Sequence, residues 1–238
     1  ISGGDGFQPL MDPTDARIVY GESQDGRMSR IDRLTNERQT IRPEPAEGEE
    51  AYRWNWDTPM MLSPHDPKTI YVGANRLFRS TDRGNSWQAI SPDLTTGVKR
   101  EEMAIMGVKD PDVKIARNDG VTTWSTLVTV AESPVRPGIL WTGSDDGVLS
   151  MSPEGGKQWT NVADKVPGVP ARTYVSKVAP SRYEARTAYV TFDGHRGGDY
   201  GTYVFVTTDL GASFRSIAGN LPAGEVARSI AEDLKNPD

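Results

Sequence analysis

The chain contains no cysteine and only two histidines, His65 and His195, in its 238 residues. The absence of cysteine excludes disulfide bonds, thiolate nucleophiles and zinc–thiolate sites. Because the two histidines lie far apart in the sequence, they form no metal-binding pattern, and neither a metal ion nor a cofactor is expected. No apolar run approaches the roughly 18 residues that would cross a bilayer, so no membrane span is expected either.

The charge and composition exclude further classes of protein. The net charge is −6, and the lysines and arginines are scattered, so no basic stripe is available for a nucleic-acid backbone. Helical periodicity is nearly absent, whereas 24 glycines and 17 prolines suit a chain with many tight turns. These features predict an all-β domain that does not bind nucleic acid.

Three eight-residue segments share one frame: a hydroxyl residue, an acid two positions later, a glycine after two more, and an aromatic residue at the end. Their framework residues are Ser80, Asp82, Gly84, Trp87; Ser152, Glu154, Gly156, Trp159; and Thr207, Asp209, Gly211, Phe214. A weaker copy lies at Arg30-Ile31-Asp32. The pattern predicts a hairpin tip in which the acid folds its own backbone and the glycine takes a positive φ. The framework residues are therefore expected to be structural.

The repeat extends beyond these boxes. Counting back from each box, Pro64, Pro67 and Gly73 correspond to Pro134, Pro137 and Gly143. Each unit is predicted to form four strands joined by tight turns, which is one blade of a β-propeller. The expected units are 1–50, 51–100, 115–168 and 171–224, with the start of a fifth at 225–238. The whole of 1–238 is thus predicted to be a single, partial β-propeller, a piece of a longer chain.

The chain resembles the Asp-box, or bacterial neuraminidase repeat, superfamily of β-propellers. The boxes carry this resemblance together with Ser2-Gly3-Gly4-Asp5-Gly6-Phe7, Tyr52-Arg53-Trp54-Asn55-Trp56 and Asn75-Arg76-Leu77-Phe78-Arg79-Ser80. The sequence is most similar to secreted bacterial repeat proteins described as sortilin-like or glycosyl-hydrolase-like. The resemblance implies a secreted or periplasmic location and further blades in the parent chain. It does not fix a function, since the superfamily contains both enzymes and receptors.

In a propeller, the residues ahead of each innermost strand share one face and can form a composite site. The ligand-binding candidates there are Arg53, Trp54, Asn55, Trp56, Trp124, Arg172, Tyr174 and Arg228; Asp119 and Thr122 lie in the same segment as Trp124. Alternation along Tyr52–Trp56 would place its three rings on one side, either as a stacking platform or as a wedge in the core. Aromatic and guanidinium groups suit both glycan and protein partners.

Catalysis is the alternative prediction. Glycoside hydrolysis needs two carboxyl groups beside the scissile bond, and Asp5 and Asp57 are the candidates. A sialidase is not favoured, because Ile41-Arg42-Pro43 has the wrong order for an Arg-Ile-Pro motif; a xyloglucanase-like domain stays open. The sequence therefore predicts a non-catalytic scaffold that binds a protein or glycan, with a glycoside hydrolase as the alternative.

Three polar loops have simpler explanations. Asp145-Asp146-Gly147 is predicted to be a hairpin turn, with calcium binding as the alternative. Lys109-Asp110-Pro111-Asp112 is predicted to be an exposed turn. The glycine-rich segment from Asp193 to Tyr200 is either a mobile cover or a functional loop.

Overall fold

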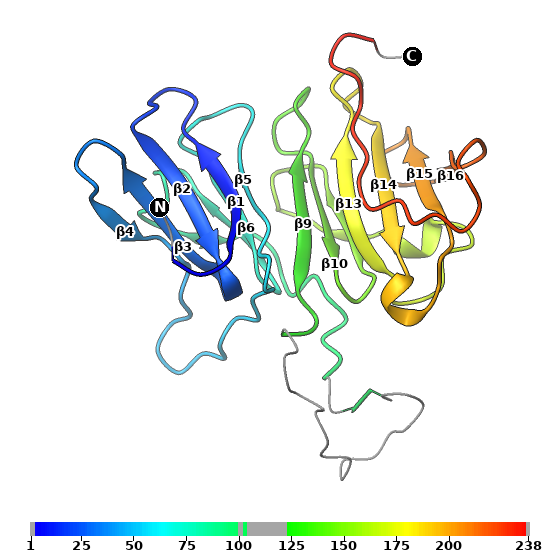
Figure 1. The fold of residues 1–238 in the computed structure, drawn as a ribbon, viewed down its shortest axis with the longest axis horizontal. Helices are drawn as coiled ribbons and strands as arrows, with labels where there is room; N and C mark the ends of the chain where they lie inside the picture. The colour runs from blue at the N-terminus through cyan, green and yellow to red at the C-terminus, as the bar shows by residue number, and fades with distance from the viewer. Residues whose placement is uncertain (1–2, 100–101, 104–122, 237–238) are drawn as a thin grey trace.

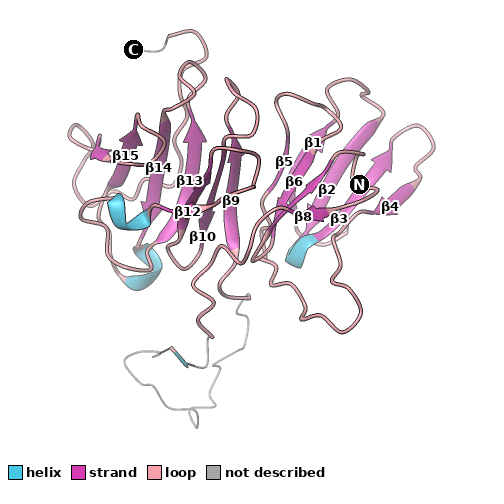
Figure 2. Ribbon diagram, turned by 180° about the vertical axis from the view of Figure 1, so that it is seen from behind, coloured by secondary structure: helices cyan, strands magenta, loops and turns pink. Residues whose placement is uncertain are grey.

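A computed structural model of the chain describes residues 3–99, 102–103 and 123–236. It contains four antiparallel sheets of four strands each, which stand side by side like the blades of a propeller (Figure 1). The all-β propeller prediction is confirmed. The view from behind also shows mostly strands (Figure 2). The longest helical segments among the described residues are short 3-10 turns such as η1 (Gln24–Gly26), η3 (Ala163–Lys165) and η4 (His195–Gly197). None of these is long and apolar enough to cross a membrane.

Each sheet is a meander of strands that follow one another in the sequence. The first sheet contains β1 (Gly6–Met11), β2 (Ile18–Ser23), β3 (Arg27–Asp32) and β4 (Arg38–Thr40). The second contains β5 (Met60–Leu62), β6 (Ile70–Gly73), β7 (Leu77–Ser80) and β8 (Gln88–Ala89). The third contains β9 (Leu127–Glu132), β10 (Leu140–Ser144), β11 (Leu149–Ser152) and β12 (Thr160–Asn161). The fourth contains β13 (Tyr174–Pro180), β14 (Ala188–Asp193), β15 (Tyr203–Thr207) and β16 (Arg215–Ser216).

The hydrophobic core lies between neighbouring sheets. Every residue of β6 and β10 is buried, because both faces of these strands are covered. On one face, Tyr71 and Leu77 of the second sheet pack with Leu127 and Leu140 of the third. Similar clusters fill the junction of the first and second sheets, around Met28, Trp54 and Phe78, and that of the third and fourth, around Trp141, Val175 and Phe192.

A glycine in the second strand allows the sheets to approach closely. A Cβ atom added at Gly73 would lie 2.9 Å from Leu127 Cβ, and one added at Gly143 would lie 2.4 Å from Val175 Cγ1. Four residues before each of these glycines, the carbonyl of Thr69 or Ile139 accepts a hydrogen bond from the residue that follows the first strand of its sheet. Ile18 accepts the same bond in the first sheet, so the residue that corresponds to the glycine there is Glu22. A carboxyl side chain thus stands where two other blades have no side chain.

The three boxes form the turns between the third and fourth strands, and we call them the box hairpins. The φ angles of Gly84, Gly156 and Gly211 are +84°, +91° and +82°. The amide of each glycine donates to the hydroxyl oxygen four residues earlier, over 2.8, 3.0 and 2.9 Å. In two box hairpins the acid also accepts from the backbone amide and hydroxyl of a serine, and these hydrogen bonds lower the pKa of Asp82 and Asp209 to about 2. The hydrogen bonds are local, which explains why the sequence pattern is so regular.

The aromatic residues of the box hairpins connect one sheet to the one before it. Trp87 Nε1 donates to the Ile41 carbonyl over 2.6 Å, and Trp159 Nε1 donates to the Ile90 carbonyl over 2.9 Å. Phe214 has no N–H group and is buried in the cluster between the third and fourth sheets. The weaker copy at Asp32 closes its turn through the Leu34 and Thr35 amides and has no glycine or aromatic residue at the corresponding positions.

After β16 the chain runs back along β13 towards the C-terminus (Figure 1). There Glu232 Oε1 accepts from Ser181 Oγ over 2.7 Å and from the Tyr189 hydroxyl over 3.1 Å. Glu132, at the end of β9, makes the same pair of contacts with Ser63 and Tyr71 of the second sheet. The final segment therefore lies on the fourth sheet much as the innermost strand of one blade lies on its predecessor.

Candidate ligand-binding site

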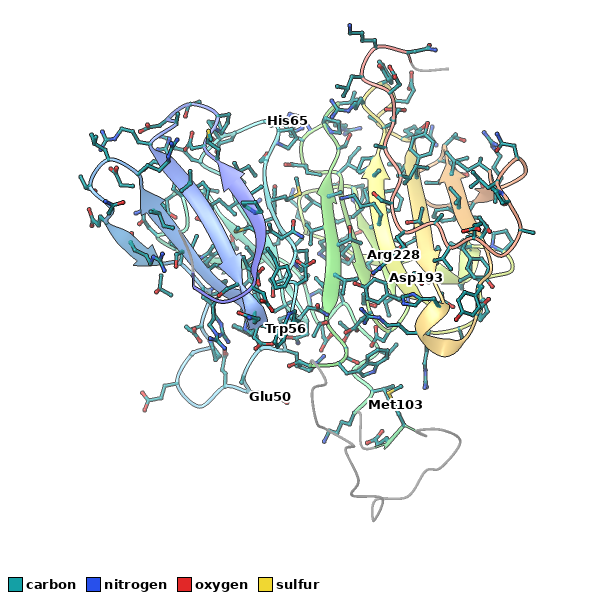
Figure 3. The ribbon with its side chains drawn as sticks, in the orientation of Figure 1. Glu50, Trp56, His65, Met103, Asp193 and Arg228 are labelled. Atoms are coloured by element: carbon teal, nitrogen blue, oxygen red, sulfur yellow. The ribbon has the colours of Figure 1, made fainter. Side chains whose placement is uncertain are left out.

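The candidate site lies at the end of the sheets where β1, β5, β9 and β13 begin, which we call the leading end. The turns between the second and third strands reach the same end, so each blade contributes two segments. Figure 3 shows Trp56, Asp193 and Arg228, from three different parts of the sequence, in this half of the molecule.

A series of hydrogen bonds crosses the first three sheets at the leading end. Gln8 Nε2 donates to Asp57 Oδ1 over 3.1 Å, and the Asp57 amide donates to Asn55 Oδ1 over 3.1 Å. Asn55 Nδ2 donates to Thr126 Oγ1 over 2.7 Å, and Thr126 Oγ1 in turn donates to Asp145 Oδ2 over 2.7 Å. These polar side chains are therefore held in place across two junctions between blades.

Asp145 is a buried carboxyl group within this network, with an exposed fraction of 5%. Burial raises its pKa to about 7, although hydrogen bonds from the amide and hydroxyl of Thr126 oppose the shift. Its neighbour Asp146 accepts from Ser125 Oγ, Ser144 Oγ and Thr96. Both carboxylates lie in the turn between β10 and β11, and both thus accept hydrogen bonds from other groups of the chain. Among the described residues no three acidic or histidine side chains are grouped to hold a metal ion.

Glu22 is a second buried carboxyl group, and the sequence analysis missed it. Its exposed fraction is 1%, and neither carboxyl oxygen has a hydrogen bond of good geometry within the described part of the chain. Burial raises its pKa to about 8; the nearby Thr58 amide opposes this shift and the charge of Asp57 adds to it. A glutamate where two other units have glycine was the signal that could have identified it.

The tryptophans of the second unit have separate positions. Trp54 is 3% exposed and stacks on Phe78, with ring centroids 6.1 Å apart. Trp56 is 38% exposed, because a turn in which Asn55 accepts from the Asp57 amide interrupts the extended chain. Of the two alternatives, the wedge in the core therefore describes Tyr52 and Trp54, which pack together against Phe78, and the stacking platform of three rings is not formed. Trp54 is thus a core residue and not a ligand-binding one, whereas Trp56 is exposed.

Arg53 holds the connection between the second and third sheets. Its Nε donates to the Ser125 carbonyl over 3.0 Å, and its Nη2 pairs with Asp93 over 2.6 Å and contacts Thr95. It also lines a cavity of about 280 Å³ with Glu49, Glu50, Ala51, Tyr52, Asn75, Arg76 and Asp93. Trp124 is half-buried beside this connection, whereas Asp119, Thr122 and Lys109–Asp112 fall outside the described residues.

The fourth sheet contributes a tyrosine surrounded by charges. The Arg196 guanidinium lies 5.4 Å from the centroid of the Tyr174 ring. Burial raises the Tyr174 pKa to about 12, with smaller effects from the charges of Arg196, Asp145, Asp57 and Arg228. Tyr174 thus lies within electrostatic range of the network that crosses the other sheets. Arg172 is exposed, and its backbone, with a φ of +64°, packs under Gly147.

The two predicted catalytic aspartates have different surroundings. Asp57 is exposed at the surface of the hydrogen-bond network and is held by Gln8. Asp5 is exposed in the bend before β1. Two other acids at this end have a raised pKa: Glu22, on which the charge of Asp57 acts, and Asp145, which is connected to Asp57 through Thr126 and Asn55. Neither was predicted to be catalytic.

Neither a protein-family model nor a curated protein sequence matches this chain. Among solved structures, the GH74 xyloglucanase of Xanthomonas campestris is similar, with a TM-score of 0.58 and 20% identity over 94% of this chain and 32% of that one. The GH74 enzyme of Niastella koreensis gives a TM-score of 0.54 and 19% identity over 91% of this chain and 30% of that one. An extracellular domain of a hybrid two-component system from B. thetaiotaomicron gives 0.52 and 12%, over 96% and 24%.

These similarities support a propeller fold. The chain spans about a third or less of the length of these three proteins. They include GH74 enzymes and an extracellular domain of a two-component system, so the likeness in fold does not define a role.

Proposed function

We propose that this chain is a non-catalytic propeller segment that binds a glycan at its leading end. The proposal depends on one observation: a hydrogen-bond network fixed across three sheets presents the exposed Trp56 ring and Asp57 carboxylate, with Tyr174 of the fourth sheet in electrostatic range. Aromatic faces stack on sugar rings, and fixed polar groups distinguish hydroxyl positions. A site built from several blades also suits an extended ligand better than a small one.

We also propose the setting of this segment. The contacts of Glu232, which repeat those of Glu132, support a fifth unit beginning at residues 225–238. The similarity to longer propeller proteins supports an arrangement in which further blades of the parent chain pack beside these. The extracellular domain among the similar structures supports a secreted or periplasmic location, and the box hairpins are the basis for proposing an Asp-box, sortilin-like bacterial protein.

Replacing Trp56 by alanine is expected to weaken glycan binding at least tenfold, because aromatic anchors contribute about 2 kcal/mol or more when truncated. The measurement is a glycan array followed by titration calorimetry with the strongest ligand. Leu34→Ala is the matched control, since Leu34 is exposed in the β3–β4 turn, away from the leading end. Equal losses in both variants, or binding only to a protein partner, would contradict the proposal.

A glycoside hydrolase is the second candidate, and one observation favours it. Glu22 and Asp145 have pKa values near or above neutrality, whereas Asp57, whose charge acts on Glu22, is exposed, and such differences between carboxyl groups are typical of acid–base pairs. To test this candidate, the wild-type chain is incubated with xyloglucan and with a sialylated oligosaccharide, and the release of reducing ends and of free sialic acid is measured. The proposed function predicts no turnover; turnover that disappears in Asp57→Asn would replace it with the second candidate.

A further inference from the structure

The Asp193 carboxylate holds the side chains of His195 and Arg228 at the leading end of the fourth sheet. Its Oδ1 contacts His195 Nδ1 at 2.5 Å, and its Oδ2 contacts Arg228 Nε at 3.0 Å. The Asp193 side chain is only 3% exposed. Burial raises its pKa, but the hydrogen bonds from His195 and the charge of Arg228 outweigh this, so that the net shift is downward. Asp193 therefore stays ionised and fixes both side chains.

Several nitrogen atoms are left for a ligand. Arg228 uses only Nε in this pair, and 62% of its side chain is exposed, so its two terminal NH₂ groups face solvent. Arg196 is exposed and stacks on Tyr174, and it makes no ion pair with any residue that the structure describes. His195 uses Nδ1, and its Nε2 has no hydrogen bond to any residue in the described ranges, so this atom can bond to a hydroxyl group.

The acids closest to Arg196 in the sequence do not neutralise it. Asp199 accepts from the Tyr203 hydroxyl over 2.8 Å and from the Gly201 amide over 2.9 Å. Asp193 is already shared between His195 and Arg228. The guanidinium groups of Arg196 and Arg228 thus supply two positive charges around Tyr174, among the negative charges of Asp193, Asp145 and Asp57.

We propose that Arg196 and Arg228 bind the carboxylate of an acidic glycan, while His195 Nε2 bonds to a neighbouring sugar hydroxyl. The proposal rests on the proposed function and narrows its ligand from glycans in general to polymers that contain uronic acids. Guanidinium groups match a carboxylate through pairs of parallel N–H donors. Tyr174, under Arg196, offers a ring edge to the same sugar, and its own hydroxyl keeps its proton because its pKa is about 12.

The test compares polygalacturonate with fully methyl-esterified polygalacturonate, which has the same backbone without the charges. We expect the wild-type chain to bind the acidic polymer at least tenfold more tightly. Arg196→Gln and Arg228→Gln should each reduce that affinity about tenfold, as the loss of a charge-assisted hydrogen bond predicts. Arg228→Lys should also lose affinity, because lysine keeps the charge but not the planar pair of donors.

Arg182→Gln is the matched control, since Arg182 is exposed beyond the far end of β13. Thermal melts of all variants check that the fold is intact. Equal affinity for the two polymers, or equal losses in Arg196→Gln and Arg182→Gln, would overturn the acidic-glycan site. If the methyl ester binds and only Trp56→Ala weakens it, the proposed function stands and this inference fails; if neither polymer nor any arrayed glycan binds, both fail.

Discussion

Replacing Gly156 by asparagine is expected to lower the free energy of unfolding by about 3 kcal/mol, whereas the same change at Gly155 is expected to cost less than about 1 kcal/mol. Both glycines have positive φ, +91° at Gly156 and +65° at Gly155. The sign of φ is therefore the same at the two positions, and the difference between them lies in the atoms that surround each glycine.

The surroundings explain the expected difference. A Cβ atom at Gly156 would lie 2.6 Å from the Ile90 carbonyl oxygen, and that oxygen cannot move away without losing its hydrogen bond from Trp159. A Cβ atom at Gly155 would lie 3.9 Å from its nearest neighbour. The other box hairpins already have Arg83 and Leu210, with φ of +60° and +62°, at the position of Gly155.

Urea unfolding of both variants, followed by tryptophan fluorescence, measures these free energies. Gly155→Asn controls for the chemistry of the new side chain, because asparagine tolerates the left-handed region. Similar losses at the two positions would show that the contact with Ile90 does not limit the packing of the third sheet on the second.

Replacing Glu22 by glutamine is expected to remove much of the dependence of stability on pH between about 5 and 8. The pKa of Glu22 is about 8 in the folded chain, against an ordinary value of 4.5. A carboxyl group whose pKa is raised by folding contributes stability that is complete below pH 4.5 and is lost as the pH rises through 8. At about 1.4 kcal/mol per pH unit, the wild-type chain should lose several kcal/mol across this range.

Glutamine is neutral at every pH, so the variant should be more stable than the wild-type chain at pH 8 and similar to it at pH 5. The measurement is the urea midpoint of both chains at several pH values. A shallower slope should remain in the variant, because the raised pKa of Asp145, about 7, acts in the same direction. Glu154→Gln, at an exposed position, is the control; an equal slope in wild type and Glu22→Gln would contradict the burial of an acid at this junction.

The sequence predicted the propeller fold because the features that specify it are local. In every box hairpin the glycine amide bonds to the hydroxyl group four residues earlier, and in two of them the acid accepts from a serine four residues later, so the spacing of these residues recurs from unit to unit. The tryptophan pair was not predictable in this way. Trp54 and Trp56 are two residues apart, and what separates core from surface is a turn and the contact with Phe78 of a neighbouring strand.

The candidate site was only partly predictable for a similar reason. Tyr174 and Arg228 were nominated from their positions ahead of expected strands, yet the residues that hold them were not. Asp193 meets Arg228 across 35 positions of the sequence, and Asp145 meets Thr126 across 19. Such partners are determined by how blades stack, which a repeat pattern predicts in general but not for individual side chains.

The links from Trp87 to Ile41 and from Trp159 to Ile90 each join one sheet only to its predecessor. Each sheet is therefore coupled energetically to its neighbours in the row, and the changes in unfolding free energy caused by substitutions at different junctions should add. The network from Gln8 to Asp145 crosses two of these couplings at once. A ligand held by that network would bind most tightly when both junctions are aligned, so that ligand binding and the stacking of blades reinforce each other.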